Sequence, residues 1–162
     1  MEHLKLPTAV VGEIDIARLR RELNGLNDFF VSTRNRTAGT AMQTPKLSRL
    51  LDQLAKDNHI NLLTEDDRDQ LLTTLNQIHE HAPRLQISFA ADPPPRALEQ
   101  ILTWLRRFIH PHCLVQVGLQ PGIAAGCIVR TPNRVFDLSL RANLKKQEPY
   151  LVKLIMGAVN ES

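Results

Sequence analysis

The residues best suited to hold a metal ion stand together in the stretch His110-Pro111-His112-Cys113. Two imidazoles and a thiol within four residues could supply three ligands to a zinc ion. Such a site normally has a second ligand pair at a recognisable spacing, whereas Cys127 stands alone elsewhere in the sequence. The sequence therefore favours a loop in which Cys113 packs as a small apolar side chain, and it predicts no metal site.

Other patterns that could bind or transform a ligand are incomplete. The segment 118–122 (GLQPG) holds two glycines but lacks the Gly-Lys-Ser/Thr of a phosphate loop and the three-glycine spacing of a dinucleotide turn. The acidic segment 65–69 (EDDRD) opens a predicted helix, and the helix dipole alone accounts for its carboxylates. The serines lack the context of a nucleophile elbow. We therefore expect no catalytic residue and no cofactor.

Composition indicates a globular protein with an unremarkable core. The chain has 162 residues, of which 43% are hydrophobic and 23% charged, both near the averages of folded domains. Its apolar runs fall short of the roughly 18–20 residues that a membrane-spanning helix needs. The first residues lack the charged-then-apolar order of a signal peptide, and two cysteines suit a reducing compartment. These features favour a cytoplasmic location.

Charge is distributed unevenly along the chain. Residues 84–162 carry ten basic and five acidic residues, whereas residues 46–83 carry four basic and seven acidic residues. The basic C-terminal half could meet an acidic protein or a nucleic acid. It could equally be a solvated basic face, and composition does not separate these alternatives.

Periodicity predicts an α+β fold. Apolar residues at steps of three and four predict helices over 13–33, from Thr44-Pro45 to about Asn58, and from Thr64 to about Ala82. Then follow a strand at 84–90, a helix at 96–109 with Phe108 on its inner side, and strands at 113–119, 124–130 and 135–137. A last helix begins near Ser139, and Pro149 must kink or split it.

We divide the chain into a helix and linker (1–45), a helical segment (46–83) and an α+β domain (84–162), whose small sheet two helices cover on one face. The inner face of the last helix is assigned to Leu140, Leu144, Leu151 and Ile155.

The stretch 116–144 (QVGLQPGIAAGCIVRTPNRVFDLSLRANL) resembles the C-terminal region of the delta subunit of F-type ATP synthases, the family of the mitochondrial protein that confers oligomycin sensitivity. In that family a glycine-containing segment ends in an arginine, passes through a hairpin turn and continues into a segment with aspartate, serine and arginine. The family's glycine pair is Ala125-Gly126 here, and the glycine after the aspartate is Leu138. The matching residues are Pro121, Ile123, Gly126, Ile128, Val129, Arg130, Val135, Asp137, Ser139, Leu140, Arg141 and Leu144.

This resemblance implies a structural role without bond chemistry. Such a subunit is a stator of a proton-translocating ATP synthase, and it links the catalytic head to the peripheral stalk at the cytoplasmic face of the plasma membrane. The implied partners are the alpha subunits and a b-type stalk subunit, with no nucleic acid and with membrane contact only through the complex. The candidate structural and interface residues are Gly126, Arg130, Asp137, Ser139, Arg141, Leu144, Lys145 and Lys146.

Residue chemistry suggests what several of these positions do. Gly126 allows a close backbone approach or a bulge at the start of a strand. Asp137 or Ser139 could cap the free N–H groups of the last helix. Arg141 lies in the first turn of that helix, where the dipole disfavours a cation, so we expect it to have a carboxylate partner in Asp137 or in another subunit.

The N-terminal region departs from the family pattern. The usual subunit begins with a six-helix bundle of roughly a hundred residues, whereas three predicted helices precede the first strand here. We therefore expect the 13–33 helix to use an exposed apolar stripe to bind an alpha subunit or the stalk. Two other functions stay open. One is a basic nucleic-acid-binding module with Phe89 and Phe136 on its strands. The other is a stator subunit of the V/A-type rotary machines, although heptads do not persist past about residue 33.

Overall fold

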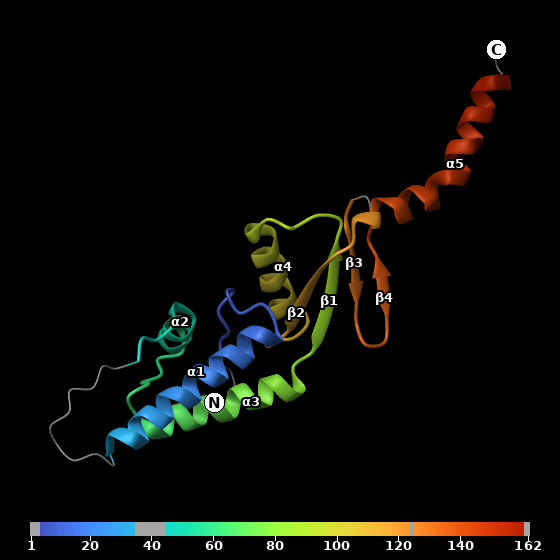
Figure 1. The fold of residues 1–162 in the computed structure, drawn as a ribbon. Coiled ribbons are helices and arrows are strands. Elements are labelled where there is room, and N and C mark those ends of the chain that lie inside the picture. The colour runs from blue at the N-terminus through green and yellow to red at the C-terminus, as the bar shows by residue number, and fades with distance from the viewer. Residues whose placement is uncertain (1–3, 35–44, 124, 161–162) are drawn as a thin grey trace. The chain divides into compact units, whose positions relative to one another are not determined.

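A computed structural model describes residues 4–34, 45–123 and 125–160 (Figure 1). N-terminal helices precede a mixed four-stranded sheet that is interleaved with helices, so the predicted α+β class is confirmed. Within the described residues, no helix is both long enough and apolar enough to cross a membrane. The elements are α1 (Glu13–Arg34), α2 (Arg49–Asp57), α3 (Glu65–His81), β1 (Arg84–Phe89), α4 (Pro95–Phe108), β2 (Leu114–Leu119), the short 3₁₀ helix η1 (Pro121–Ile123), β3 (Cys127–Arg130), β4 (Val135–Asp137) and α5 (Leu140–Asn160).

The chain forms two compact units. The N-terminal unit comprises Met1–Pro83 and Leu98–Val115, and the C-terminal unit comprises Arg84–Ala97 and Gln116–Ser162. The N-terminal unit is therefore built from two separate stretches of sequence.

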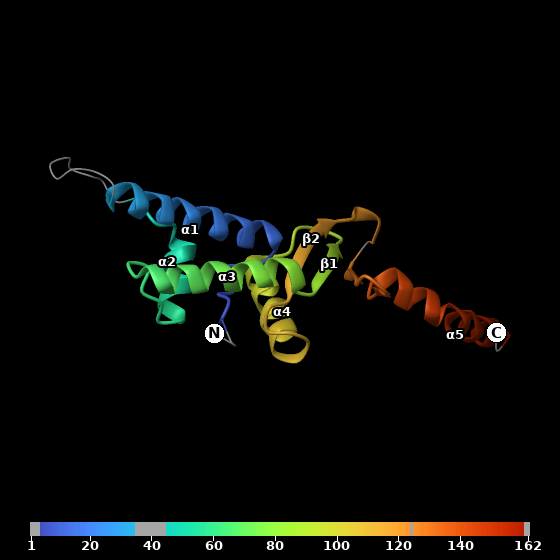
Figure 2. The ribbon, with the colours of Figure 1, turned by 90° about the horizontal axis from the view of Figure 1, so that it is seen from below.

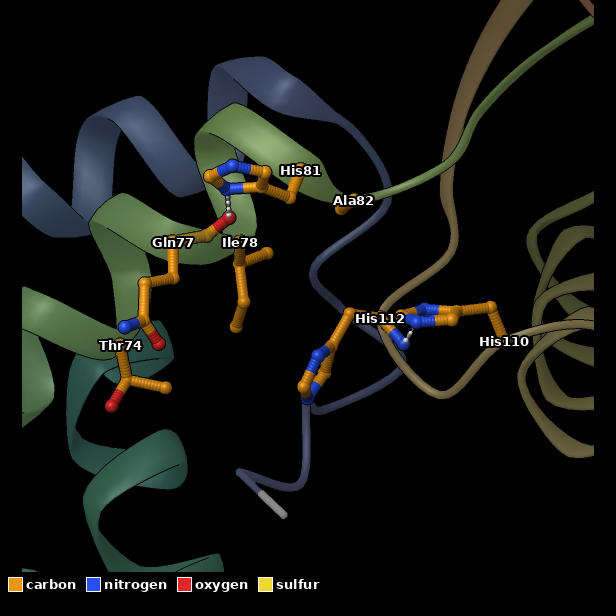
Figure 3. Close-up of a pocket in the computed structure, with 7 residues that line it drawn as sticks. All are labelled: Thr74, Gln77, Ile78, His81, Ala82, His110 and His112. Carbon is orange, nitrogen blue, oxygen red and sulfur yellow. Dashed lines mark hydrogen bonds between the residues drawn. The ribbon is translucent and has the colours of Figure 1, made fainter. Parts of the chain in front are cut away.

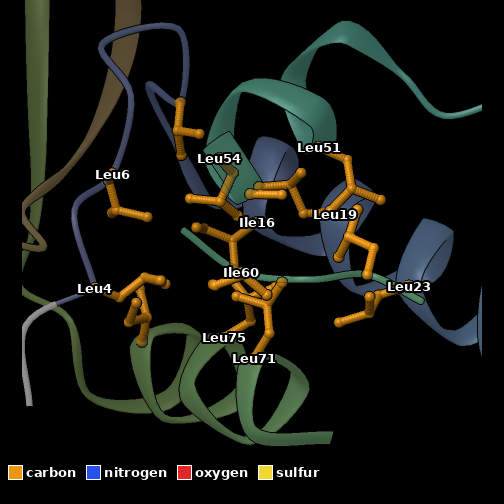
Figure 4. Close-up of a cluster of buried hydrophobic side chains, with 14 of the residues drawn as sticks. Leu4, Leu6, Ile16, Leu19, Leu23, Leu51, Leu54, Ile60, Leu71 and Leu75 are labelled. Carbon is orange, nitrogen blue, oxygen red and sulfur yellow. The ribbon is translucent and has the colours of Figure 1, made fainter. Parts of the chain in front are cut away.

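Helices α1 and α3 lie side by side in the N-terminal unit and enclose its core (Figures 1 and 2). The apolar stripe of α1 points into this core, where Ile16, Leu19 and Leu23 are fully buried. The prediction that this stripe is exposed for a partner is wrong, because α2 and α3 supply the apolar surface that covers it. Figure 4 shows the cluster, which includes Leu4, Leu6, Leu51, Leu54, Ile60, Leu71 and Leu75.

A segment without helix or strand, which includes a turn closed by the Val10 N–H and the Pro7 carbonyl, is held in the same unit. This segment, residues 4–11, is called the N-terminal strap, and it buries Leu4, Leu6 and Val10. The Arg106 guanidinium of α4 donates hydrogen bonds to three of its carbonyl oxygens, at 3.2 Å to Leu6, at 2.9 Å to Pro7, and to Val10. Burial lowers the pKa of Arg106, and the Cys113 thiol nearby opposes that shift.

The predicted boundaries hold for α3 but not for α2. The predicted start of α2 at Pro45 is wrong, since α2 begins at Arg49 and the Ser48 hydroxyl accepts a 3.2 Å hydrogen bond from the backbone N–H of Leu51. Thr44 lies outside the described residues. Helix α3 begins after Thr64 and ends before Ala82, as predicted.

The sheet has the strand order β2-β1-β3-β4. In the C-terminal unit, β1 pairs antiparallel with β3 so that Ile87 faces Val129, and β3 pairs antiparallel with β4 so that Arg130 faces Val135. The tight turn predicted between β3 and β4 is confirmed, because the N–H of Thr131 donates a 2.8 Å bond to the carbonyl of Arg134. The third predicted strand starts later than expected, at Cys127.

Two helices differ from their predicted faces. On α4, Leu102 and Leu105 are buried as predicted, but Phe108 is exposed. On α5, the predicted inner residues Leu140 and Leu144 are half exposed, so this part of the helix does not cover the sheet; the side chains of Leu151 and Ile155 lie outside the described residues. Helix α5 continues through Pro149 without splitting, and its ribbon bends along its length (Figure 1).

Candidate functional site

The hairpin β3–β4 leads into α5 through a closely packed junction, and most of the residues that carry the family resemblance lie there. Gly126 has a φ of +90°, a backbone conformation that side chains with a Cβ rarely adopt. A Cβ at this position would lie 2.5 Å from the carbonyl oxygen of Leu138 and 3.1 Å from the Cα of Ser139. The close backbone approach predicted for Gly126 is therefore confirmed.

Backbone hydrogen bonds hold the two sides of this junction together. The N–H of Leu138 donates to the carbonyl of Cys127 at 3.0 Å, and the N–H of Leu140 donates to the carbonyl of Ala125 at 2.9 Å. These bonds flank Gly126 on both sides. They fix the point at which α5 leaves the hairpin.

Asp137 and Ser139 form the turn into α5. The backbone N–H of Ser139 donates a 3.0 Å hydrogen bond to Oδ1 of Asp137, and Ser139 is buried. The pKa of Asp137 is lowered, first by the side-chain and then by the backbone hydrogen bond from Ser139, with smaller contributions from the positive charges of Lys146 and Arg141. Asp137 therefore closes the turn that precedes α5, and it is ionised at neutral pH; the hydrogen bond goes to the N–H of Ser139, one residue before the helix, so the predicted capping of the helix N–H groups stays a prediction.

A basic hollow of about 560 Å³ opens beside this turn. It brings together three cations and one carboxylate at the start of α5, so its surface is positively charged overall. The positive charges of Lys146 and, to a smaller extent, Arg141 help to lower the pKa of Asp137, and the carboxylate partner expected for Arg141 stays a prediction. The residues that line the hollow are Gln120, Gly122, Ile123, Ile128, Asp137, Ser139, Arg141, Lys145 and Lys146.

Three of the predicted residues lie outside the hollow. Gly126 packs against the backbone of Leu138 and Ser139. Arg130 is exposed at the opposite end of β3, beside the hairpin turn. Leu144 is half exposed on α5. Five of the eight predicted residues thus line the basic hollow. Gly126 packs against the backbone of Ser139, which is one of the five.

Helix α5 extends from the junction as an amphipathic basic surface. Leu140, Leu144, Tyr150 and Val152 are each between 45% and 67% exposed. Lys145, Lys146 and Lys153 are exposed on the same helix. Among the described residues of the C-terminal unit, no other element packs along α5 (Figures 1 and 2). An uncovered helix with apolar and cationic side chains is typical of an interaction surface.

The histidines of the considered metal motif lie in a separate pocket of the N-terminal unit (Figure 3). His81 uses Nδ1 in a 3.2 Å contact with the carbonyl of Gln77, and His110 Nδ1 accepts a 3.1 Å hydrogen bond from the backbone N–H of His112. His112 Nε2 lies 2.9 Å from the carbonyl oxygen of Leu4. These ring nitrogens therefore contact backbone groups of the N-terminal unit.

Cys113 is fully buried, as the sequence analysis expected, and burial raises the pKa of its thiol. Within the part of the chain that the structure describes, no group of three or more His, Cys, Asp or Glu side chains could hold a metal ion.

A scan of protein-family models finds no match, and a search of curated proteins finds none either. The function is therefore argued from the junction and α5.

Proposed function

We propose that this chain is a non-catalytic stator subunit of a proton-translocating F-type ATP synthase, located at the cytoplasmic face of the plasma membrane. Its role is to link the catalytic head, through the alpha subunits, to a b-type subunit of the peripheral stalk. The observation that carries the proposal is α5, an exposed amphipathic helix whose start is fixed by the residues that resemble the delta-subunit family.

The geometry of the junction suits an attachment point that must resist torque. A stator must resist torque, so a binding helix needs a defined exit angle. Gly126 brings two backbone segments together, the flanking hydrogen bonds tie them, and Asp137 accepts the backbone N–H of Ser139 in the turn before α5. In this proposal the b-type helix packs on the apolar side chains of α5, while the cations of the basic hollow and of α5 form a charged rim. Rim charges contribute to the association rate and to salt dependence more than to affinity.

Co-expression with a b-type subunit tests the proposal directly. The complex is expected to survive purification in moderate salt, because apolar packing supplies most of the affinity. Leu144→Ser should weaken it by roughly tenfold or more if Leu144 is a central contact, since such contacts exceed about 1 kcal/mol. The matched control is Ile14→Ser, since Ile14 is an exposed apolar residue on α1 of the other unit.

A charge-reversal pair separates rim from core contacts. Lys145→Glu with Lys146→Glu should slow association and change its salt dependence, whereas Arg134→Glu, at the distant hairpin turn, should not. Failure of the b-type subunit to associate with the unaltered chain would refute the stator role. Tight binding of RNA or DNA with a steep salt slope would instead support the nucleic-acid alternative.

A further inference from the structure

Helix α4 carries two exposed aromatic side chains beside its buried leucines, and with Ile109, which follows the helix, they form a ridge that faces solvent. Leu102 and Leu105 point into the protein, whereas Trp104, Phe108 and Ile109 are 55%, 64% and 53% exposed. These three residues, here called the α4 ridge, follow one another at helical spacing and belong to the N-terminal unit. Trp104 is the only tryptophan in a chain with 4% aromatic residues, and the structure leaves it outside the core.

The ridge is organised by contacts among its own side chains. The rings of Trp104 and Phe108 lie 5.7 Å apart and are tilted by 40°. The guanidinium of Arg107 lies 5.3 Å from the centre of the Phe108 ring. Exposed aromatic side chains beside an arginine have the composition of the residues that dominate binding energy in protein interfaces.

A hollow of about 400 Å³ on the same helix carries only positive charge. Its cations are Lys5, Arg106 and Arg107, and no aspartate or glutamate lines it. Arg106 has its hydrogen bonds to the carbonyls of the N-terminal strap, so among the described contacts its charge is not neutralised by a carboxylate. Arg107 belongs to both the hollow and the ridge. The remaining lining residues are Leu4, Leu6, Thr8, Thr103 and Pro111.

We propose that the α4 ridge and this hollow form a docking surface for an amphipathic helix that has an apolar face and carboxylates along its edge. The apolar face would cover Trp104 and Phe108, and a glutamate or aspartate would enter the hollow to meet Arg107 and Lys5. Charge complementarity selects this partner, because the hollow holds three cations and no anion. A second copy of this chain fits poorly, since the same cations would face one another.

Trp104 provides a direct reporter, because it is the sole tryptophan of the chain and belongs to the proposed surface, where its ring lies beside that of Phe108. The probe is a synthetic helical peptide of about 18 residues with a leucine face flanked by glutamates and without aromatic residues. A second peptide has lysine in place of every glutamate. Titration of the full chain with the glutamate peptide is expected to shift Trp104 emission to shorter wavelength in a saturable manner, and the lysine peptide is expected to cause no such shift.

Two variants and two matched controls locate the binding. Phe108→Ser and Arg107→Glu should each raise the dissociation constant of the glutamate peptide by about tenfold or more. Leu63→Ser and Arg21→Glu change an exposed apolar residue and an exposed arginine elsewhere in the N-terminal unit. These two controls should leave the dissociation constant of the glutamate peptide unchanged. Arg107→Glu should in addition improve binding of the lysine peptide.

Several results would overturn the proposal. These are the absence of a saturable shift with the glutamate peptide, equal binding of both peptides, or an equal loss in the Leu63→Ser control. A larger shift with phosphatidylglycerol vesicles than with the peptide would assign the surface to a lipid membrane instead. A shift that depends on protein concentration alone would assign it to self-association. The test uses no ATP synthase subunit. A negative result therefore does not count against the stator proposal, and failure of the stator proposal does not count against this docking surface.

Discussion

Substitution of Gly126 by alanine is expected to weaken the junction that fixes α5. Gly126 has a φ of +90°, and an added Cβ would lie 2.5 Å from the carbonyl oxygen of Leu138. The atoms in the way belong to the backbone, so a side-chain rotation cannot relieve the contact. Either the hairpin or the start of α5 has to move.

The size of the effect follows from two contributions. Holding alanine in a left-handed conformation costs about 1–2 kcal/mol. Relief of the Cβ contact must lengthen the neighbouring hydrogen bonds from Leu138 to Cys127 or from Leu140 to Ala125, and each such bond is worth about 0.5–1.5 kcal/mol. We therefore expect the free energy of opening the junction to fall by about 1.5–3.5 kcal/mol.

Amide hydrogen exchange measures this opening where it occurs. Exchange of the β3 and Leu140 amides should accelerate in Gly126→Ala, and the urea midpoint of the C-terminal unit should fall. Gly122→Ala is the control, because Gly122 lies in the same unit and a Cβ there meets nothing within 4 Å. Alkylation of the buried Cys113 thiol reports on the N-terminal unit and should be unchanged.

The reasoning is refuted if Gly126→Ala and Gly122→Ala behave alike. It is also refuted if protection of Cys113 falls as much as protection of the β3 amides, because the strain would then not be confined to the junction.

Three further predictions concern other parts of the chain. Gly25→Ala should stabilise the N-terminal unit by about 0.5–1 kcal/mol in a urea melt, because this glycine lies inside α1 and an added Cβ meets nothing within 4 Å. Arg106→Met should destabilise the same unit by about 2–3 kcal/mol, because three partly buried carbonyls of the N-terminal strap lose their hydrogen-bond donor. Limited proteolysis of this variant should then cut within the strap, and an uncut strap would contradict the prediction. Asp137 has a lowered pKa, so its stabilising contribution should be constant above about pH 5 and lost as the pH falls through the ordinary aspartate value and then the lower native one. An NMR titration of the Ser139 amide should follow that loss, and Asp137→Asn should abolish the titration.

The sequence predicted the order of elements well because the periodic signals were strong. Helix α1 lies where apolar spacing placed it, β4 follows the predicted tight turn, and the backbone at Gly126 makes the close approach that its missing side chain suggested. The start of α2 was misplaced because proline at a first helical position competed with the serine cap at Ser48. Two cap signals so close together cannot be ranked without the three-dimensional packing.

The locations of the arginines and of the exposed apolar residues could not be predicted. Arg68 is buried, where it donates to the Leu62 carbonyl at 3.0 Å and lies over the Phe30 ring, although its sequence neighbours are acidic. Phe108 and Leu144 fit apolar stripes and are nevertheless exposed. A stripe identifies a face that avoids water, but it does not identify whether the covering surface belongs to the same chain.

The hydrogen bond between Arg106 and Leu6 joins positions that are 100 residues apart in the sequence. A ribosome that has made α1, α2 and α3 has therefore not yet made the guanidinium that secures the first residues, nor Val115, whose N–H donates to the Val11 carbonyl at 2.8 Å. During translation the strap therefore lacks these two fastenings until α4 and the start of β2 have been made. A fragment that ends at Pro83 would keep the buried cluster except for Leu114, but its strap would be held by apolar packing without the bonds from Arg106 and Val115.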